Sequence, residues 1–203
     1  MSSSVKSGPI PAGRLQRGSS SSDNHISKFR QVLIRHGLTM SVIAIVCLFA
    51  PFILDGFNSS LDKFFIFPSR YFVWFLGVAL FIFGYLKFTK KYLNVRQIAW
   101  ISYLFLISVV EEIGFRLGLP LIFTSEFIGL DTFWIGVILS NLIFASIHYF
   151  TLRWKITACV FTFLGGMGFS RLFSVTDDLA LVILIHWAVT FLNTPSAPKG
   201  LNN

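Results

Sequence analysis

Hydrophobic residues are gathered into long runs along this chain, and short polar segments separate the runs. Six of the runs approach or reach the length of about 17 to 25 residues at which an α-helix crosses a bilayer. The pattern therefore predicts an all-α, polytopic membrane protein with about six transmembrane helices. We expect these helices over residues 38–54, 71–88, 98–123, 132–150, 156–173 and 179–192.

The first 36 residues follow a different pattern, which is rich in Ser, Gly, Pro and basic side chains and has Asp23 as its single acid. Such a composition cannot bury a core, so we expect a basic tail that is disordered or bound to a partner. It lacks the apolar region of a secretory signal, and a transit peptide is an alternative. We divide the rest into two amino-terminal helices (37–96), a core of four helices (97–195) and a short tail (196–203).

The composition agrees with a membrane protein, because 54% of the residues are hydrophobic and only 13% are charged. These values lie outside the range of soluble globular domains. The net charge of +8 is explained better by membrane topology than by nucleic-acid binding, since the basic residues gather in the polar connections. Cys47 and Cys159 lie in separate apolar runs, so neither a disulfide framework nor a zinc ribbon is expected.

Basic residues alternate between the two sides of the predicted bundle. They are frequent in the amino-terminal tail and in the second and fourth connections, whereas the first, third and fifth connections are mainly acidic. Because cytoplasmic loops of membrane proteins are enriched in Lys and Arg, both termini are predicted to lie in the cytoplasm. The host membrane could be a plasma, thylakoid or other organellar membrane.

When the charged residues counted with the connections, including Lys87 and Arg171, are set aside, five ionisable residues remain within the predicted spans, namely Glu111, Glu112, Arg116, His148 and His186. A charged side chain at the middle of a bilayer costs at least about 2.5 kcal/mol, so such residues usually mark a functional site. At about 1.5 Å of rise per residue, Glu111 and both histidines fall within one central slab of the membrane. We therefore expect these side chains to converge.

The two glutamates are expected to have different partners. Arg116 follows Glu112 by four residues and shares its helix face, so the two side chains can form an ion pair. Glu111 projects about 100° away from Glu112 and is free to face the histidines. A carboxylate and a histidine in a site with little water can activate a water molecule for peptide hydrolysis.

Three short motifs occur in order on three of the predicted helices. The sequence EEIGFR (111–116) fits EExxxR, FASIH (144–148) fits FxxxH, and HWAVTFLN (186–193) begins with a further histidine. In this order they resemble the CAAX prenyl protease and bacteriocin-processing family (CPBP, or Abi) of glutamic-type intramembrane proteases. The similarity covers residues 98–193 and includes the segment between the second and third motifs.

The resemblance implies an intramembrane endopeptidase that cleaves a membrane-associated peptide or protein with a glutamate-activated water. In this family the residue that matches Glu111 acts with the histidine that matches His148 to activate the water. The residue that matches His186 stabilises the developing oxyanion. Glu112 and Arg116 would support the site as a fixed pair.

The family has an Asn four residues after the last histidine, where this chain has Thr190. The hydroxyl of Thr190 can donate one hydrogen bond, whereas Asn193 shares the helix face but sits about 10 Å further along the axis. Loss of one oxyanion donor typically costs about 100- to 1000-fold in rate, so a divergent active site and an inactive one are both open. We count Thr190, Asn193 and Asn141 among the supporting residues.

Other functions of these residues are weighed against the protease. One Glu and two His could bind zinc, but no HExxH or other compact ligand spacing occurs. Two membrane histidines could ligate haem or chlorophyll, but such ligation would not require the carboxylates. No cofactor is therefore expected. The main alternative, favoured by Thr190, is a non-catalytic subunit or assembly factor of a larger membrane complex, held through residues 1–36.

Overall fold

The computed structural model describes residues 29–126 and 132–198, so the predictions for residues 1–28 lie outside the described part. The regular structure of the described residues is helical throughout. Among them, five helical segments are long and apolar enough to cross a membrane: Phe29–Leu48, Pro68–Phe88, Val95–Ser125, Phe133–Thr151 and Ile156–Thr176. The chain is an integral, polytopic all-α membrane protein, as the hydrophobic pattern predicts.

The first membrane segment begins earlier than the pattern predicts. It consists of α1 (Phe29–Val32), the π-helical η1 (Leu33–Gly37) and α2 (Leu38–Leu48). Val32 is buried in the core and Phe29 packs against it, although Arg30 and Arg35 interrupt the hydrophobic pattern here. Residues 29–36, which the pattern assigned to the tail, are therefore part of the helical bundle.

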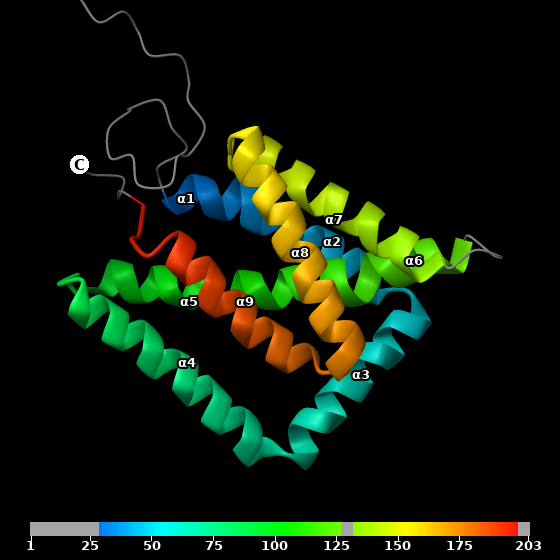
Figure 1. Ribbon diagram of the computed structural model, residues 1–203, viewed down its shortest axis with the longest axis horizontal. Helices are drawn as coiled ribbons and strands as arrows, with labels where there is room; N and C mark the ends of the chain where they lie inside the picture. The colour runs from blue at the N-terminus through cyan, green and yellow to red at the C-terminus, as the bar shows by residue number, and fades with distance from the viewer. Residues whose placement is uncertain (1–28, 127–131, 199–203) are drawn as a thin grey trace, which may run out of the picture.

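A separate helix follows α2, so the prediction of one span over residues 38–54 is wrong. The chain is extended at Ala50, and Pro51 begins α3 (Pro51–Ile66). Proline fits the first turn of a helix because the N–H that it lacks would have no partner there. Figure 1 shows α3 and α4 (Pro68–Phe88) as the two arms of a V that meet near Pro68.

The centre of the bundle is a continuous helical segment made of α5 (Val95–Glu112), the π-helical η2 (Ile113–Gly118) and α6 (Leu119–Glu126). Asn94 begins it as an N-cap, because its side chain accepts a hydrogen bond from the backbone N–H of Gln97. α7 (Thr132–Thr151) packs against α6 and η2, and α9 (Leu179–Asn193) packs along α5. α8 (Ile156–Thr176) contacts both α7 and α9, and in Figure 1 it passes across the central segment and meets α9 at one end.

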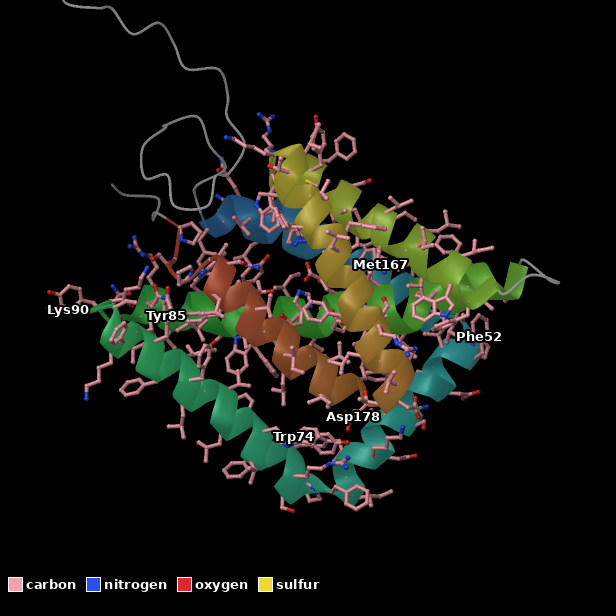
Figure 2. The ribbon with its side chains drawn as sticks, in the orientation of Figure 1. Phe52, Trp74, Tyr85, Lys90, Met167 and Asp178 are labelled. Carbon is pink, nitrogen blue, oxygen red and sulfur yellow. The ribbon has the colours of Figure 1, made fainter. Side chains whose placement is uncertain are left out.

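α9 has 15 residues and is shorter than the other membrane segments. Asp178 caps its first turn by accepting a hydrogen bond from the backbone N–H of Leu181. The other carboxylate oxygen of Asp178 accepts hydrogen bonds from Tyr71 (3.0 Å) and Arg70 (3.4 Å) at the start of α4. Figure 2 labels Asp178 at this end of α9, which is therefore fastened to the corner between α3 and α4.

Gly114 and Gly118 allow η2 to approach α2 closely. A Cβ atom at Gly118 would lie 2.6 Å from the Cβ of Cys47, and one at Gly114 would contact the backbone of Ala44 at 3.7 Å. Small residues at such contacts are what permits close packing between membrane helices. The contact fixes the helix that carries both glutamates against the amino-terminal segment.

We predict that Gly118→Ala destabilises the protein, because the added methyl group would overlap Cys47. Overpacking of this kind typically costs about 1 to 3 kcal/mol. Thermal unfolding in detergent measures the effect, and Gly77→Ala is the matched control because nothing lies within 4 Å of a Cβ atom at that position in α4. Equal melting temperatures for the two variants would contradict the packing argument.

Candidate active site

The ionisable residues of the predicted spans lie together in the interior of the bundle. Glu111 and Glu112 come from the last turn of α5, Arg116 from η2, His148 from α7 and His186 from α9. None of the five exposes more than 5% of its surface. Three helical segments that are distant in sequence, namely α5 with η2, α7 and α9, thus contribute to one polar cluster.

Arg116 is held by Glu112 and by α7. Its Nε lies 3.2 Å from Oε2 of Glu112, a contact that is poorly aligned for a hydrogen bond and acts mainly through charge. Nη1 donates to Oδ1 of Asn141 (3.1 Å), and the guanidinium lies 4.9 Å from the ring centre of Phe144. A Cβ atom at Gly166 on α8 would overlap Oδ1 of Asn141, so this glycine provides the room for the contact.

His186 connects the two glutamates. Its Nδ1 lies 2.6 Å from Oε1 of Glu112, and its Nε2 lies 3.5 Å from Oε2 of Glu111. The first distance is a short hydrogen bond and the second is longer than a normal one. The ring of His186 is therefore fixed through Glu112, and its other nitrogen faces Glu111.

Glu111 faces histidines on both sides, as its position on the helix predicts. Its Oε1 lies 2.8 Å from Nε2 of His36 and 3.8 Å from Nε2 of His148, and its Oε2 faces His186. The structure thus brings together Glu111, His148 and His186. It also adds His36, which the sequence analysis missed.

His36 belongs to η1 and is buried, with 4% of its surface exposed. Its ring packs edge-on against that of His148, with 4.6 Å between the ring centres. Its Nδ1 lies 2.9 Å from the hydroxyl oxygen of Thr151 at the end of α7. The signal that could have found it is the spacing of Phe29, Val32 and Leu33, which extends the first hydrophobic run backwards past His36 at helical intervals.

His148 has a defined orientation because its Nδ1 donates a hydrogen bond to the backbone carbonyl of Phe144 (2.8 Å), one turn earlier on α7. A carbonyl oxygen can only accept, so Nδ1 carries the hydrogen. Nε2 of the neutral ring is then an acceptor that faces Glu111. Phe144 therefore contacts two residues of the cluster. Its carbonyl accepts a hydrogen bond from His148, and its ring packs against the guanidinium of Arg116.

Two of the predicted supporting residues stand apart from the cluster. Thr190 and Asn193 both lie on α9 and are partly exposed. In the described part of the chain, no hydrogen bond joins the side chain of either residue to His186 or to a glutamate. The structure therefore brings Asn141, Glu112 and Arg116 into the site but not these two.

His36, Glu111 and His148 are the described residues whose geometry could hold a metal ion, because one ligand atom of each lies within 4.8 Å of the others. This set has one glutamate and two histidines, as in the zinc alternative, with His36 as one of the histidines. The hydrogen bond of 2.8 Å between His36 and Glu111 already satisfies these two side chains. The contacts therefore account for the cluster as a hydrogen-bonded network.

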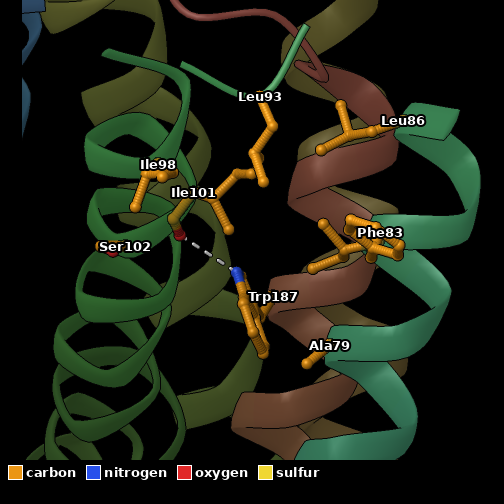
Figure 3. A pocket seen from close by; sticks show the side chains of 9 residues that line it. Ala79, Phe83, Leu86, Leu93, Ile98, Ile101, Ser102 and Trp187 are labelled. Carbon is orange, nitrogen blue, oxygen red and sulfur yellow. Dashed lines mark hydrogen bonds between the residues drawn. The ribbon is translucent and has the colours of Figure 1, made fainter. Parts of the chain in front are cut away.

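An apolar pocket of about 200 Å³ lies between α4, α5 and α9. Its lining includes Ala79, Ile82 and Ile101, together with Trp187, the residue that follows His186. Figure 3 shows the indole N–H of Trp187 donating to the backbone carbonyl of Ile101, at 3.2 Å. The hydrogen bond satisfies the polar atom of the indole, so the walls are hydrocarbon apart from Ser102.

Comparison with protein-family models gives a match over residues 93–192, to the family described as type II CAAX prenyl endopeptidase, Rce1-like. The matched residues include both glutamates, Arg116, His148 and His186, whereas His36 lies outside them. No curated protein and no solved structure matches the chain significantly.

We predict that Arg116→Ala costs about 3 to 5 kcal/mol of stability, because it leaves Glu112 as a buried carboxylate without its cationic partner. Thermal unfolding measures the loss, and Arg96→Ala, at an exposed position of α5, is the control. A second change, Glu112→Gln, should recover part of the loss because it removes the stranded charge. A normal melting temperature for Arg116→Ala would contradict the pairing.

Proposed function

The chain belongs, through residues 93–192, to the Rce1-like family of type II CAAX prenyl endopeptidases, and on this premise we propose that it hydrolyses a peptide bond of a membrane-associated substrate with a water activated by Glu111. The observation that carries the proposal is the convergence of histidines on one buried carboxylate. Glutamate and histidine are common general bases, and a site with little water strengthens their action.

The contact between Glu111 and His148 suits the activation of water. Oε1 of Glu111 and Nε2 of His148 are both acceptors, and they lie 3.8 Å apart. This separation is too long for a direct hydrogen bond but short enough for one water molecule to donate to both atoms. The water would pass a proton to Glu111 as its oxygen attacks the substrate carbonyl, and His148 would hold its other hydrogen.

His186 is placed to act on the oxygen of the substrate carbonyl. Its Nδ1 is engaged by Glu112, so Nε2, once it carries a hydrogen, is the atom that could donate to a developing oxyanion. Arg116 contacts Glu112, and Asn141 in turn holds Arg116, so both support the ring indirectly. Thr190, four residues further along α9, could add a second donor only by a side-chain rotation toward His186.

The substrate class is proposed from the family and the apolar pocket. A prenylated peptide would bring a hydrocarbon chain, and the pocket beside Trp187 offers apolar walls for one. We place both termini of the protein on the cytoplasmic side, because the basic connections would then face the cytoplasm. The partners in this proposal are the substrate, the lipid bilayer and, through the part of residues 1–36 that precedes the bundle (1–28), a larger complex.

A prediction about the catalytic step concerns Glu111. Glu111→Gln keeps the size and polarity of the side chain but removes the proton acceptor, so the cleavage rate should fall by about 100- to 10,000-fold. Cleavage of peptides in reconstituted vesicles measures the rate, and Asp55→Asn at an exposed position of α3 is the control. The melting temperature shows that Glu111→Gln still folds.

Thr190→Asn extends this experiment, because it restores the donor that the family has at this position. It should raise the rate of the natural chain. If the natural chain and Thr190→Asn both leave a broad set of membrane peptides uncut, while deletion of residues 1–28, which keeps the buried Val32 and His36, abolishes assembly with a membrane complex, the protein is a non-catalytic subunit.

The next prediction concerns the pocket. Ala79→Phe fills part of it and should raise the KM for a prenylated peptide about tenfold or more, with kcat unchanged. The KM for the same peptide without the prenyl group should not change. Leu80→Phe is the matched control, because the neighbouring side chain is 60% exposed. An equal effect of Ala79→Phe on both peptides would show that the pocket does not take the prenyl group.

A further inference from the structure

The protonation of Nδ1 of His36, the ring nitrogen that faces Thr151 and not Glu111, can be deduced from its neighbours. The hydroxyl of Thr151 has one hydrogen, which it donates to the backbone carbonyl of Ile147 at 2.7 Å. Its oxygen can then only accept from the ring nitrogen that lies 2.9 Å away. Nδ1 of His36 therefore carries a hydrogen, and the ring is held in one orientation.

The inner side of His36 meets Glu111. Nε2 lies 2.8 Å from Oε1, a distance at which two lone pairs would repel, so one hydrogen lies between the two atoms. If this hydrogen belonged to Glu111, the carboxyl group would be neutral and could not take a proton from water. For Glu111 to act as a base, the hydrogen must belong to His36, which is then an imidazolium.

The charges of the cluster also favour a protonated, positively charged His36. Glu111 and Glu112 together bring two negative charges, and Arg116 brings one positive charge, so one further positive charge balances the cluster. The ring of His36 has an acceptor within 2.9 Å of each nitrogen. By contrast, the inner nitrogen of His148 is 3.8 Å from Glu111 and that of His186 is 3.5 Å from it.

We propose that His36 is a positioning residue for Glu111, which holds the carboxylate ionised and turned toward His148. The inference rests on the proposed function and extends it, because His36 lies outside the residues that match the family. His36 occupies one lone-pair direction of Oε1 and leaves the other for water. Each buried carboxylate then has its own cation, Arg116 for Glu112 and His36 for Glu111.

Two substitutions of His36 distinguish a role in positioning Glu111 from a role in folding alone. In His36→Gln the amide nitrogen can reach the place of Nε2 and still donate to Glu111, whereas in His36→Asn it reaches only the place of Nδ1. We expect kcat to fall about 10- to 100-fold in His36→Asn, the typical loss when a partner that orients a reacting group is removed. His36→Gln should retain more activity, and KM should change little in both.

The kinetic outcomes distinguish this inference from the proposed function. If the natural chain cleaves peptides, Glu111→Gln does not, and both substitutions of His36 keep a normal kcat, then the inference fails and the protease stands. If the natural chain is inactive, the proposed function fails and the inference falls with it. Equal losses in His36→Gln and His36→Asn, in parallel with their melting temperatures, would show a purely structural role.

The protonation of His36 gives a second readout that does not depend on turnover. Nitrogen NMR of the chain labelled with ¹⁵N-histidine in micelles should show both ring nitrogens of His36 carrying hydrogen, with the signal assigned by its loss in His36→Gln. The Nε2 signal should change in Glu111→Gln. A ring in which either nitrogen is bare, above all Nε2, or zinc bound at one ion per chain and lost in His36→Gln, would overturn the inference.

Discussion

The requirement that buried carboxylates have charged or hydrogen-bonding partners determines how this bundle is arranged. Apolar contacts do little to determine which helices of a membrane protein pack together, because the lipid tails are as apolar as the side chains. Glu111 and Glu112 instead require specific partners, and they find them on η1, η2, α7 and α9. The residues of the candidate site are thus also the contacts that set which helices meet.

The sequence predicts most of the helices but not where two of them begin. Long runs such as 71–88 and 156–173 lie within α4 and α8, because neither contains a proline that would end a helix. The errors fall where charge or backbone chemistry disturbs the pattern. Arg30 and Arg35 interrupt the hydrophobic run, so the pattern places the start of the first segment too late. The residues on both sides of Ala50 are apolar, so the pattern does not show the break between α2 and α3 at Pro51.

The part of the site that lies on one helical segment could be predicted from the sequence, whereas the contacts between segments could not. Helix geometry along one segment is fixed by the period of 3.6 residues, so the separate directions of Glu111 and Glu112 and the return of Arg116 to Glu112 follow from spacing. Contacts between segments do not follow from spacing. His36 and Thr151 meet the cluster only because η1 and α7 lie against the same end of α5. Among the described residues no hydrogen bond joins the hydroxyl of Thr190 to the cluster, although Thr190 follows His186 by one turn of α9.

The shortness of α9 has a consequence for the membrane around the protein. Its 15 residues extend about 22 Å, whereas the hydrocarbon layer of a bilayer is about 30 Å thick. Where α9 spans a bilayer, thinning of the lipid beside it would relieve this mismatch, at a cost of a fraction of a kcal/mol for each Å. His186 lies at the middle of this short helix, so thinner lipid there would bring headgroup water nearer to the cluster.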